Sequence, residues 1–178
     1  ALMSEYDLVF DWNTYQKVKV TGLDDAEQDG NQSYNLTMAY SSGDTDFSTV
    51  SEIISVENAD NDVAGISVTP SSRILNITEG NTANFTVSLN TQPAAGQTVT
   101  FTFSSPDEDE ITLSAGTIEF SHDDWETDTI TVTAVNDMVD DVNNPAAYTI
   151  NLGNATSGDG NYTGMSAEIG RASGRERG

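Results

Sequence analysis

The sequence predicts an all-β fold, an antiparallel sandwich with little or no helix, and three observations support this. Apolar and polar residues alternate with a period of two in segments rich in Val, Ile, Thr and Phe, the pattern of a strand with one buried face. Clusters of Gly, Asn, Asp and Pro separate these segments as turns. No segment shows the 3.6-residue apolar stripe of a helix. Short strands at such spacing are typical of a sandwich.

The expected strands follow one another along most of the chain. The first is "KVKVTGL" (17–23), and "SEIISV" (51–56) leads directly into the acidic stretch "ENADND" (57–62). Five further strands are expected: "ISVTP" (66–70), "ANFTVSL" (83–89), "TVTFTF" (98–103), "TIEF" (117–120) and "TITVTAV" (129–135). The turn clusters "EGN", "NTQPAAGQ" and "SSPDED" separate the middle strands.

The chain repeats itself over the length of a whole domain. The segment from Trp12 matches the segment from Trp125, with one small gap and one small insertion, and "SGDTDF" (42–47) matches "SGDGNY" (157–162). The matched pairs are Trp12 with Trp125, Val18 with Ile130, Val20 with Val132, Asp25 with Asp137, and Tyr34 with Tyr148. Such repeats are typical of arrays of near-independent modules.

The repeat predicts one and a half modules. Residues 1–62 match only the second half of a module, and residues 63–167 form a complete or nearly complete one. The first segment then holds about three strands whose partner sheet is missing, so we expect it to be the less stable part.

The segment 168–178 changes abruptly to Arg and Gly. We interpret it as a non-native tail and exclude it from the expected fold. On that interpretation the chain is a fragment of a longer reading frame.

The charge of the chain argues against several classes of partner. Lys and Arg total 6 against 29 Asp and Glu, a formal net charge of -23. Such a surface repels phosphate backbones and anionic lipids, so nucleic-acid binding and direct membrane insertion are not expected. There is no cysteine, which excludes disulfides and thiolate zinc sites. No apolar run reaches the roughly 18–20 residues of a membrane span, and no signal peptide is evident.

Acidic residues gather in corresponding loops of the two copies. "LDDAEQDGNQSY" and "VNDMVDDVNNPAAY" both follow the strand after the Trp, and "ENADND" is expected at the same pole as the first loop. Ca²⁺ binds six to eight oxygen ligands, which carboxylates and Asn side chains supply from tight turns. A zinc site would need His or Cys, and the chain has a single His, His122.

These segments resemble the Calx-β module, found in sodium–calcium exchangers and many large bacterial surface proteins. The resemblance rests on "ITEGNTANFTVSL" (77–89), on the pattern V-x-x-L/V-D/N-D-x-x-x-D at 20–29 and 132–141, and on "DNDVAG" (60–65). It implies an Ig-like, Greek-key sandwich that binds Ca²⁺ at the pole facing the next module.

The resemblance also implies two sets of calcium ligands. One set joins the copies: Asp24, Asp25, Asp29, Asp60 and Asp62. The other lies in the second copy: Glu79, an acid among Asp107 and Asp109, and Asn136, Asp137 and Asp141. Each set lacks contributors of the family pattern, so both sites should bind more weakly than an intact one. The alternative for these acids is a solvated loop that discourages edge-to-edge aggregation.

The sequence offers no catalytic constellation. His122 precedes Asp123 and Asp124, but no nucleophile is placed nearby, and an exposed loop His is the simpler interpretation. Trp12 and Trp125 are interpreted as packing residues at sheet ends. We therefore expect a non-enzymatic, calcium-binding structural repeat of an extracellular or cell-surface adhesin-like protein.

In this interpretation calcium rigidifies the junctions between modules, and the partners are neighbouring repeats of the same chain. A protein or carbohydrate ligand on a cell surface is also possible. The alternatives are a carbohydrate- or protein-binding sandwich module, a calcium-sensing regulatory module of a membrane protein, and an accessory domain of a secreted enzyme.

Overall fold

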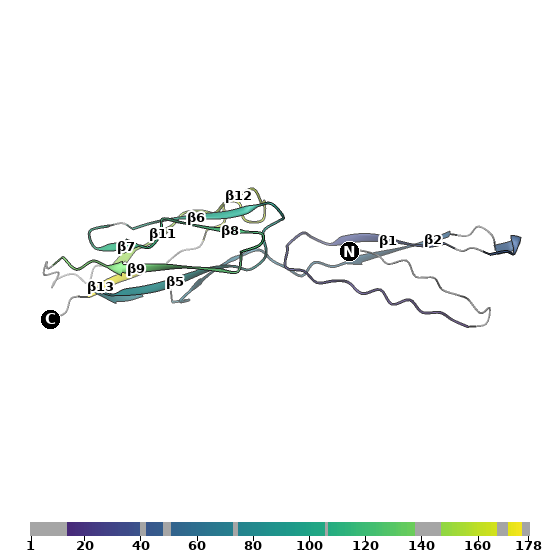
Figure 1. Cartoon of the computed structure of the whole chain (residues 1–178), viewed down its shortest axis with the longest axis horizontal. Helices are drawn as coiled ribbons and strands as arrows, with labels where there is room; N and C mark the ends of the chain where they lie inside the picture. Colours follow the sequence, from purple (N-terminus) through teal and green to yellow (C-terminus); the bar gives the residue numbers. More distant parts are fainter. Residues whose placement is uncertain are drawn as a thin grey trace. The chain divides into compact units, whose positions relative to one another are not determined.

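The computed structural model describes most of the chain and divides it into two compact units (Figure 1). Unit 1 comprises Ala1–Asp25 and Asp29–Asn61, and unit 2 comprises Ala26–Gln28 and Asp62–Gly178. The principal boundary between the two units therefore lies after Asn61. The sequence predicted this boundary one residue later, after residue 62. The described residues are 14–39, 42–47, 51–72, 75–105, 107–137, 147–166 and 171–175.

Within these ranges the regular structure is almost entirely β, with no α-helix. The predicted all-β sandwich class is confirmed. The strands are β1 (Gln32–Ala39), β2 (Ser51–Asn58), β3 (Ile66–Thr69), β4 (Leu75–Thr78), β5 (Thr82–Leu89), β6 (Thr98–Ser104), β7 (Ile111–Leu113), β8 (Thr117–Ser121), β9 (Thr127–Ala134), β10 (Ala147–Thr149), β11 (Asn151–Leu152), β12 (Thr156–Ser157) and β13 (Arg171–Arg175), and one 3-10 turn, η1, spans Thr45–Phe47. The part of the chain that is described contains no helix long and apolar enough to cross a membrane.

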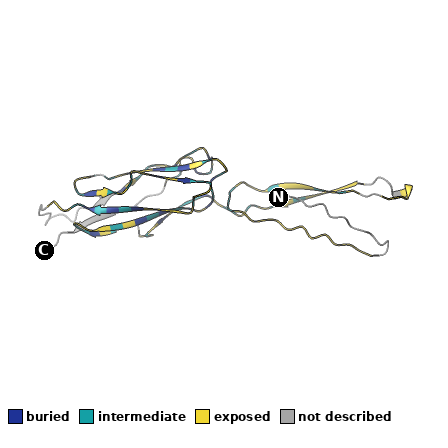
Figure 2. Ribbon diagram, in the orientation of Figure 1, coloured by how far each residue is buried: buried dark blue, intermediate teal, exposed yellow. Residues whose placement is uncertain are grey.

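Unit 2 is built of two layers that enclose one core. One layer is the antiparallel sheet β3-β5-β9-β7, and the other is centred on β6, which pairs with β8, β11 and β12 (Figure 1). Alternate residues of β5 and β6 are buried, so the period-two pattern becomes one inward-facing row on each sheet (Figure 2). Phe85 on β5 meets Phe103 on β6 with ring centroids 5.6 Å apart. This contact joins the two layers.

The register of the strands defines two poles in unit 2. β5 and β9 pair antiparallel, with Ala83 opposite Val132 and Ser88 opposite Thr127. The loops 79–81, 105–110 and 135–137 therefore share one end, the distal pole. The loops 62–65, 90–97 and 121–126 share the other, the proximal pole.

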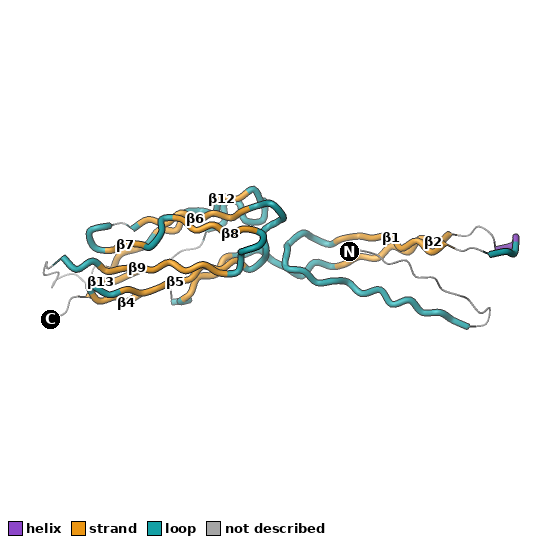
Figure 3. Tube along the Cα trace, in the orientation of Figure 1, coloured by secondary structure: helices purple, strands orange, loops and turns teal. Residues whose placement is uncertain are grey.

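Unit 1 differs from the predicted three strands. Among its described residues, the sheet consists of β1 and β2, paired antiparallel from Gln32↔Asn58 to Ala39↔Ser51. The predicted strand 17–23 is wrong, because these residues form no strand (Figure 3). Its counterpart in unit 2, β9, lies between β5 and β7 and bonds to both. The described residues of unit 1 provide no such neighbours, so the alternation at 17–23 has no ladder to join.

The two copies share the same turn chemistry at "SGDTDF" and "SGDGNY". In the first, the Asp44 N–H donates to the Ser two residues before it (3.0 Å), and its Oδ1 accepts from the N–H two residues after it (3.0 Å). In the second, Asp159 makes the corresponding bonds at 3.0 and 2.8 Å. Such side-chain turns are determined locally, so the repeated sequence gives a repeated structure.

Residues 171–175, which sequence reasoning excluded from the fold, form strand β13. It pairs antiparallel with β10 and parallel with β4. That segment 168–178 is a non-native tail stays a prediction, because the pairing of β13 does not test where the segment comes from.

Candidate metal centre

The distal pole of unit 2 brings together the three loops that carry the second predicted ligand set. The N–H of Gly80 donates to the carbonyl of Ala134 (2.9 Å), and the N–H of Val135 donates to the carbonyl of Glu110 (2.8 Å). Gly80 has φ of +71°, which a side chain would disfavour and which lets the Glu79–Gly80 turn lie beside Asn136. Backbone hydrogen bonds thus hold the Glu79, Asp107–Glu110 and Asn136–Asp137 segments together.

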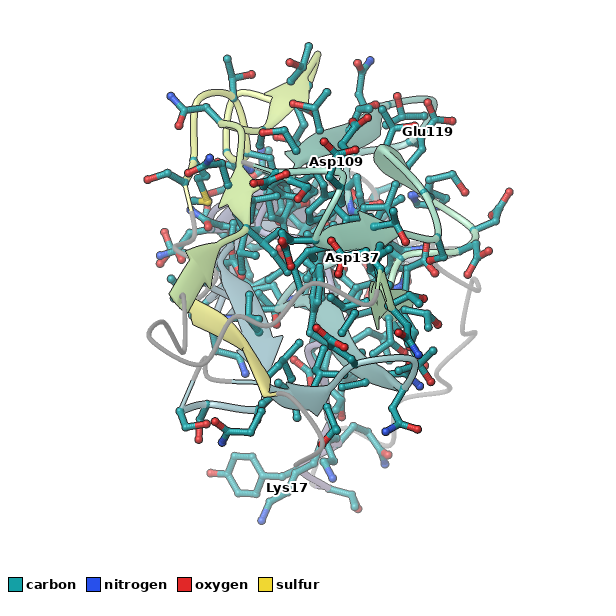
Figure 4. All side chains as sticks on the ribbon, turned by 90° about the vertical axis from the view of Figure 1, so that its left-hand side faces the viewer. Lys17, Asp109, Glu119 and Asp137 are labelled. Carbon is teal, nitrogen blue, oxygen red and sulfur yellow. The ribbon has the colours of Figure 1, made fainter. Side chains whose placement is uncertain are left out.

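The side chains at this pole offer oxygen atoms. Asp109 and Asp137 are exposed, on the loops before β7 and after β9 (Figure 4). Asp107 is half-buried; its Oδ1 accepts from the N–H of Asp109 (3.2 Å) and its carbonyl from the Ser105 hydroxyl (2.8 Å). Glu79 is half-buried and Asn136 exposed. The sequence from residue 74 to residue 170 contains no Lys or Arg. The register of β13 on β4 places Arg175 opposite Thr78, next to this pole.

Among the described residues, however, no three Asp, Glu or His side chains come close enough to hold a metal ion. The donor chemistry of the pole suits Ca²⁺, whose ligands are carboxylate, amide and backbone oxygens. Its described carboxylates alone do not form a cage. The remaining predicted ligand, Asp141, lies outside the described residues.

The first predicted set is divided between the units. Asp24, Asp25, Asp29 and Asp60 belong to unit 1, and Asp62 belongs to unit 2. Asp24 and Asp25 are exposed, and the Oδ2 of Asp29 accepts from Gln32 Nε2 at 3.1 Å.

Within unit 1 the acidic stretch after β2 meets the turn before β1, as the sequence predicted. Asp60 Oδ2 accepts from the N–H of Gly30 (2.7 Å), and the Asp60 N–H donates to Asn31 Oδ1 (3.0 Å). Glu57 Oε1 accepts from Asn31 Nδ2 (2.9 Å), and Asn58 Nδ2 donates to the carbonyl of Leu23 (2.8 Å). Neutral backbone and amide donors therefore satisfy these side chains in part, which reduces the need for a cation.

The proximal pole of unit 2 contains a polar contact that sequence reasoning missed. His122 was expected to be an exposed loop residue, but its side chain is only 31% exposed. Its Nδ1 lies 2.9 Å from the carbonyl oxygen of Pro93 and 3.2 Å from Glu27 Oε1. Both neighbours are acceptors, so Nδ1 carries the proton. The partner is 95 positions away in the sequence, and no local signal indicates it.

The segment Ala26–Gln28 is bound into this pole from several sides. The carbonyl of Ala26 accepts from the N–H of Gln92 (2.7 Å), and Gln28 Oε1 accepts from the N–H of Ala64 (2.6 Å). The carbonyl of Gln28 accepts from Asn161 Nδ2 (2.8 Å). We call Ala26–Gln28 the inserted segment.

Two further polar residues at the proximal pole are buried. Asp159 accepts from the N–H groups of Ala94 (2.9 Å) and Asn161 (2.8 Å). The hydroxyl of Tyr162 donates to the carbonyl of Thr91 (2.6 Å), and Tyr162 is fully buried. These bonds fix loops to the core, and nothing in them indicates a ligand. Trp125 is half-buried and packs against the core, whereas Trp12 lies outside the described residues.

Comparisons with known proteins identify no family. No protein-family model matches the chain, and no curated protein matches its sequence. Among solved structures it is similar to one titled "Structure of surface layer protein SbsC, domains 1-6", with 19% identity and a TM-score of 0.45. The match covers 74% of this chain but only 16% of that chain. A likeness at this level carries no argument about function.

Proposed function

We propose that this chain is a calcium-binding structural repeat of an extracellular or cell-surface protein. The observation that supports it best is the distal pole of unit 2, where three loops rich in carboxylate and amide oxygens converge. The repeated turns of the two copies support the proposal that the chain belongs to an array of similar modules. The proposed activity is mechanical rather than catalytic, and the proposed partners are neighbouring repeats.

A bound calcium ion would reduce the electrostatic repulsion among the carboxylates of this pole. Clustered carboxylates repel one another, and a bound cation relieves that repulsion. A cation that binds only the folded state stabilises it by RT ln(1 + [L]/Kd), about 0.4–1.4 kcal/mol when its concentration is one to ten times Kd. Extracellular calcium sites function with Kd values of about 10⁻⁴–10⁻³ M. Millimolar calcium would therefore fill roughly half to nine-tenths of such sites.

Thermal unfolding of the full chain tests the proposal. We expect the midpoint of unit 2, followed by near-ultraviolet circular dichroism, to rise in millimolar Ca²⁺ relative to EDTA. Mg²⁺ at matched ionic strength should give a smaller rise. The paired change Asp107→Asn and Asp137→Asn should abolish the calcium-specific rise. Glu119→Gln, which removes one charge from the face of β8, and Asp128→Asn, at the start of β9, serve together as the charge-matched control.

Two results would contradict calcium binding at this pole. One is an equal response to Ca²⁺ and Mg²⁺, which indicates screening of a solvated acidic surface. The other is an unchanged calcium response in the Asp107→Asn, Asp137→Asn variant.

A binding module for carbohydrate or protein is the second candidate. The observation in its favour is Tyr15, which is 97% exposed in unit 1. Unit 2 gives it less support, because Trp125 packs against the core instead of forming a stacking platform. Titration with oligosaccharides, followed by Tyr fluorescence, separates the two candidates.

A further inference from the structure

Unit 1 presents an apolar face that nothing in the described chain buries. Tyr34 lies opposite Val56 and Leu36 opposite Ile54 on one face of the β1–β2 pair. None of the four is buried, and all the buried apolar residues of the described chain lie in unit 2 (Figure 2). A sheet with one apolar face is stable only when that face is covered.

Unit 2 shows what lies beside the corresponding strands. Tyr34 of β1 corresponds to Tyr148 of β10, and Tyr148 pairs with Ala172 of β13 as Tyr34 pairs with Val56 of β2. The other edge of β13 pairs with β4 in parallel. The sheet of unit 1 has only two strands, so the corresponding edge of β2 has no strand partner among the described residues.

Residues 17–23 likewise have no strand partner among the described residues. Val18 is 63% exposed and Val20 50% exposed, whereas their counterparts Ile130 and Val132 are 1% and 0% exposed. In unit 2 these counterparts lie on β9, which pairs with β5 along most of its length. The elements that complete the fold in unit 2 are β4, β5 and β6, which all lie within residues 63–113.

We propose that the apolar face of unit 1 is the docking surface for a polypeptide segment that carries the strand pattern of residues 63–113. One strand of this segment, like β4, pairs in parallel with the free edge of β2. A second strand, like β5, pairs antiparallel with residues 17–23 and converts them into a strand. A third, like β6, lies in the layer that encloses Val18 and Val20. The docking requires no calcium, so it is independent of the proposed function.

A second copy of this chain fits the surface less well. A two-fold dimer joins two identical strand edges antiparallel, whereas the corresponding edge in unit 2 receives a parallel strand. The formal charge of -23 on each copy also opposes self-association.

Extension of the chain tests the proposal. A copy of residues 63–113 is joined ahead of residue 1, because Trp12 aligns with Trp125 and residue 114 therefore aligns with residue 1. Hydrogen–deuterium exchange of the amides in 17–23 and 51–58 is compared with the unextended chain. We expect exchange to slow by roughly 100-fold, as for amides that open only with their folding unit. In the matched control the added copy carries the changes Phe85→Asp and Val87→Asp, and exchange should remain fast.

Three outcomes would overturn the proposal. The first is fast exchange at 17–23 in the extended chain while unit 2 retains its normal protection. The second is equal protection from the control copy with the two Asp substitutions. The third is a concentration-dependent dimer of the unextended chain that protects 17–23 and is lost on Val18→Asp, which would assign the face to a second copy.

A second measurement covers the case in which the extended chain does not fold. A synthetic peptide of residues 75–89, which contains β4 and β5, is added to the full chain. Slower exchange at 51–58 supports the proposal, and no change at saturating peptide counts against it.

Discussion

The two units give different structures to the same sequence pattern. Val20 in unit 1 and Val132 in unit 2 occupy equivalent places in the repeat, yet one is 50% exposed and the other fully buried. Val132 lies on a strand that has a neighbour on each edge and a second layer above it. Val20 lies in a segment without strand pairing. Alternation therefore makes a segment able to become a strand, and a neighbouring strand decides whether it does.

The largest loss of stability is expected from a substitution in the core of unit 2. Phe101 is fully buried and meets Phe120 edge to face at 6.2 Å. Phe101→Ala should lower the free energy of unfolding by about 3–5 kcal/mol. Guanidinium unfolding followed by circular dichroism measures it. Ile54→Ala on the exposed face of unit 1 is the control, and an equal loss there would mean that this face is buried after all.

The equivalent valines provide a matched pair. Val132→Thr buries a hydroxyl in the core and should cost unit 2 about 1–3 kcal/mol. Val20→Thr should change stability by less than about 0.5 kcal/mol, because its side chain remains in water. The two variants are compared in the same urea titration. Similar costs for both would contradict the difference between the units.

The Tyr162 hydroxyl should contribute a comparable amount. It bonds to the carbonyl and hydroxyl of Thr91 in a buried place. Tyr162→Phe leaves these groups without that partner and should cost about 1–3 kcal/mol. Tyr34→Phe, at 44% exposure in unit 1, is the matched control and should have almost no effect. Thermal unfolding of the two variants decides the point, and a stable Tyr162→Phe would show that the bonds are dispensable.

The smallest effect is expected at the inserted segment. Glu27 and His122 are each about 30% exposed, so solvent screens their contact. Glu27→Gln should reduce the stability of unit 2 by less than about 1 kcal/mol. The nuclear magnetic resonance signal of His122, the single His of the chain, reports the change directly. Asp123→Asn, an exposed neighbour, should leave that signal in place; an equal shift from both variants would point to a general charge effect.

Local signals predicted most of the fold. Six of the seven segments expected to be strands form strands, because their alternation matches the two-layer core and their turns contain Gly, Asn and Asp. The strand predicted at 17–23 does not form, because a strand needs a neighbouring strand to pair with, and the alternation within 17–23 carries no information about that neighbour. The site was predicted less completely. The contact of Asp60 with the turn at Gly30 follows from the order of the strands. The contact of His122 with Glu27 depends on the tertiary fold, which brings together two residues far apart in the sequence.

The inserted segment also has a consequence for how such modules can be exchanged between proteins. The three residues Ala26–Gln28 belong to unit 2 but are encoded within unit 1. A recombination breakpoint at residue 62 would transfer unit 2 without them, and would leave the N–H groups of Gln92 and Ala64 short of their acceptors. The segment of sequence that is exchanged therefore does not coincide with the unit that folds. A unit 2 moved to another protein would need a preceding segment that supplies the acceptors of Ala26–Gln28.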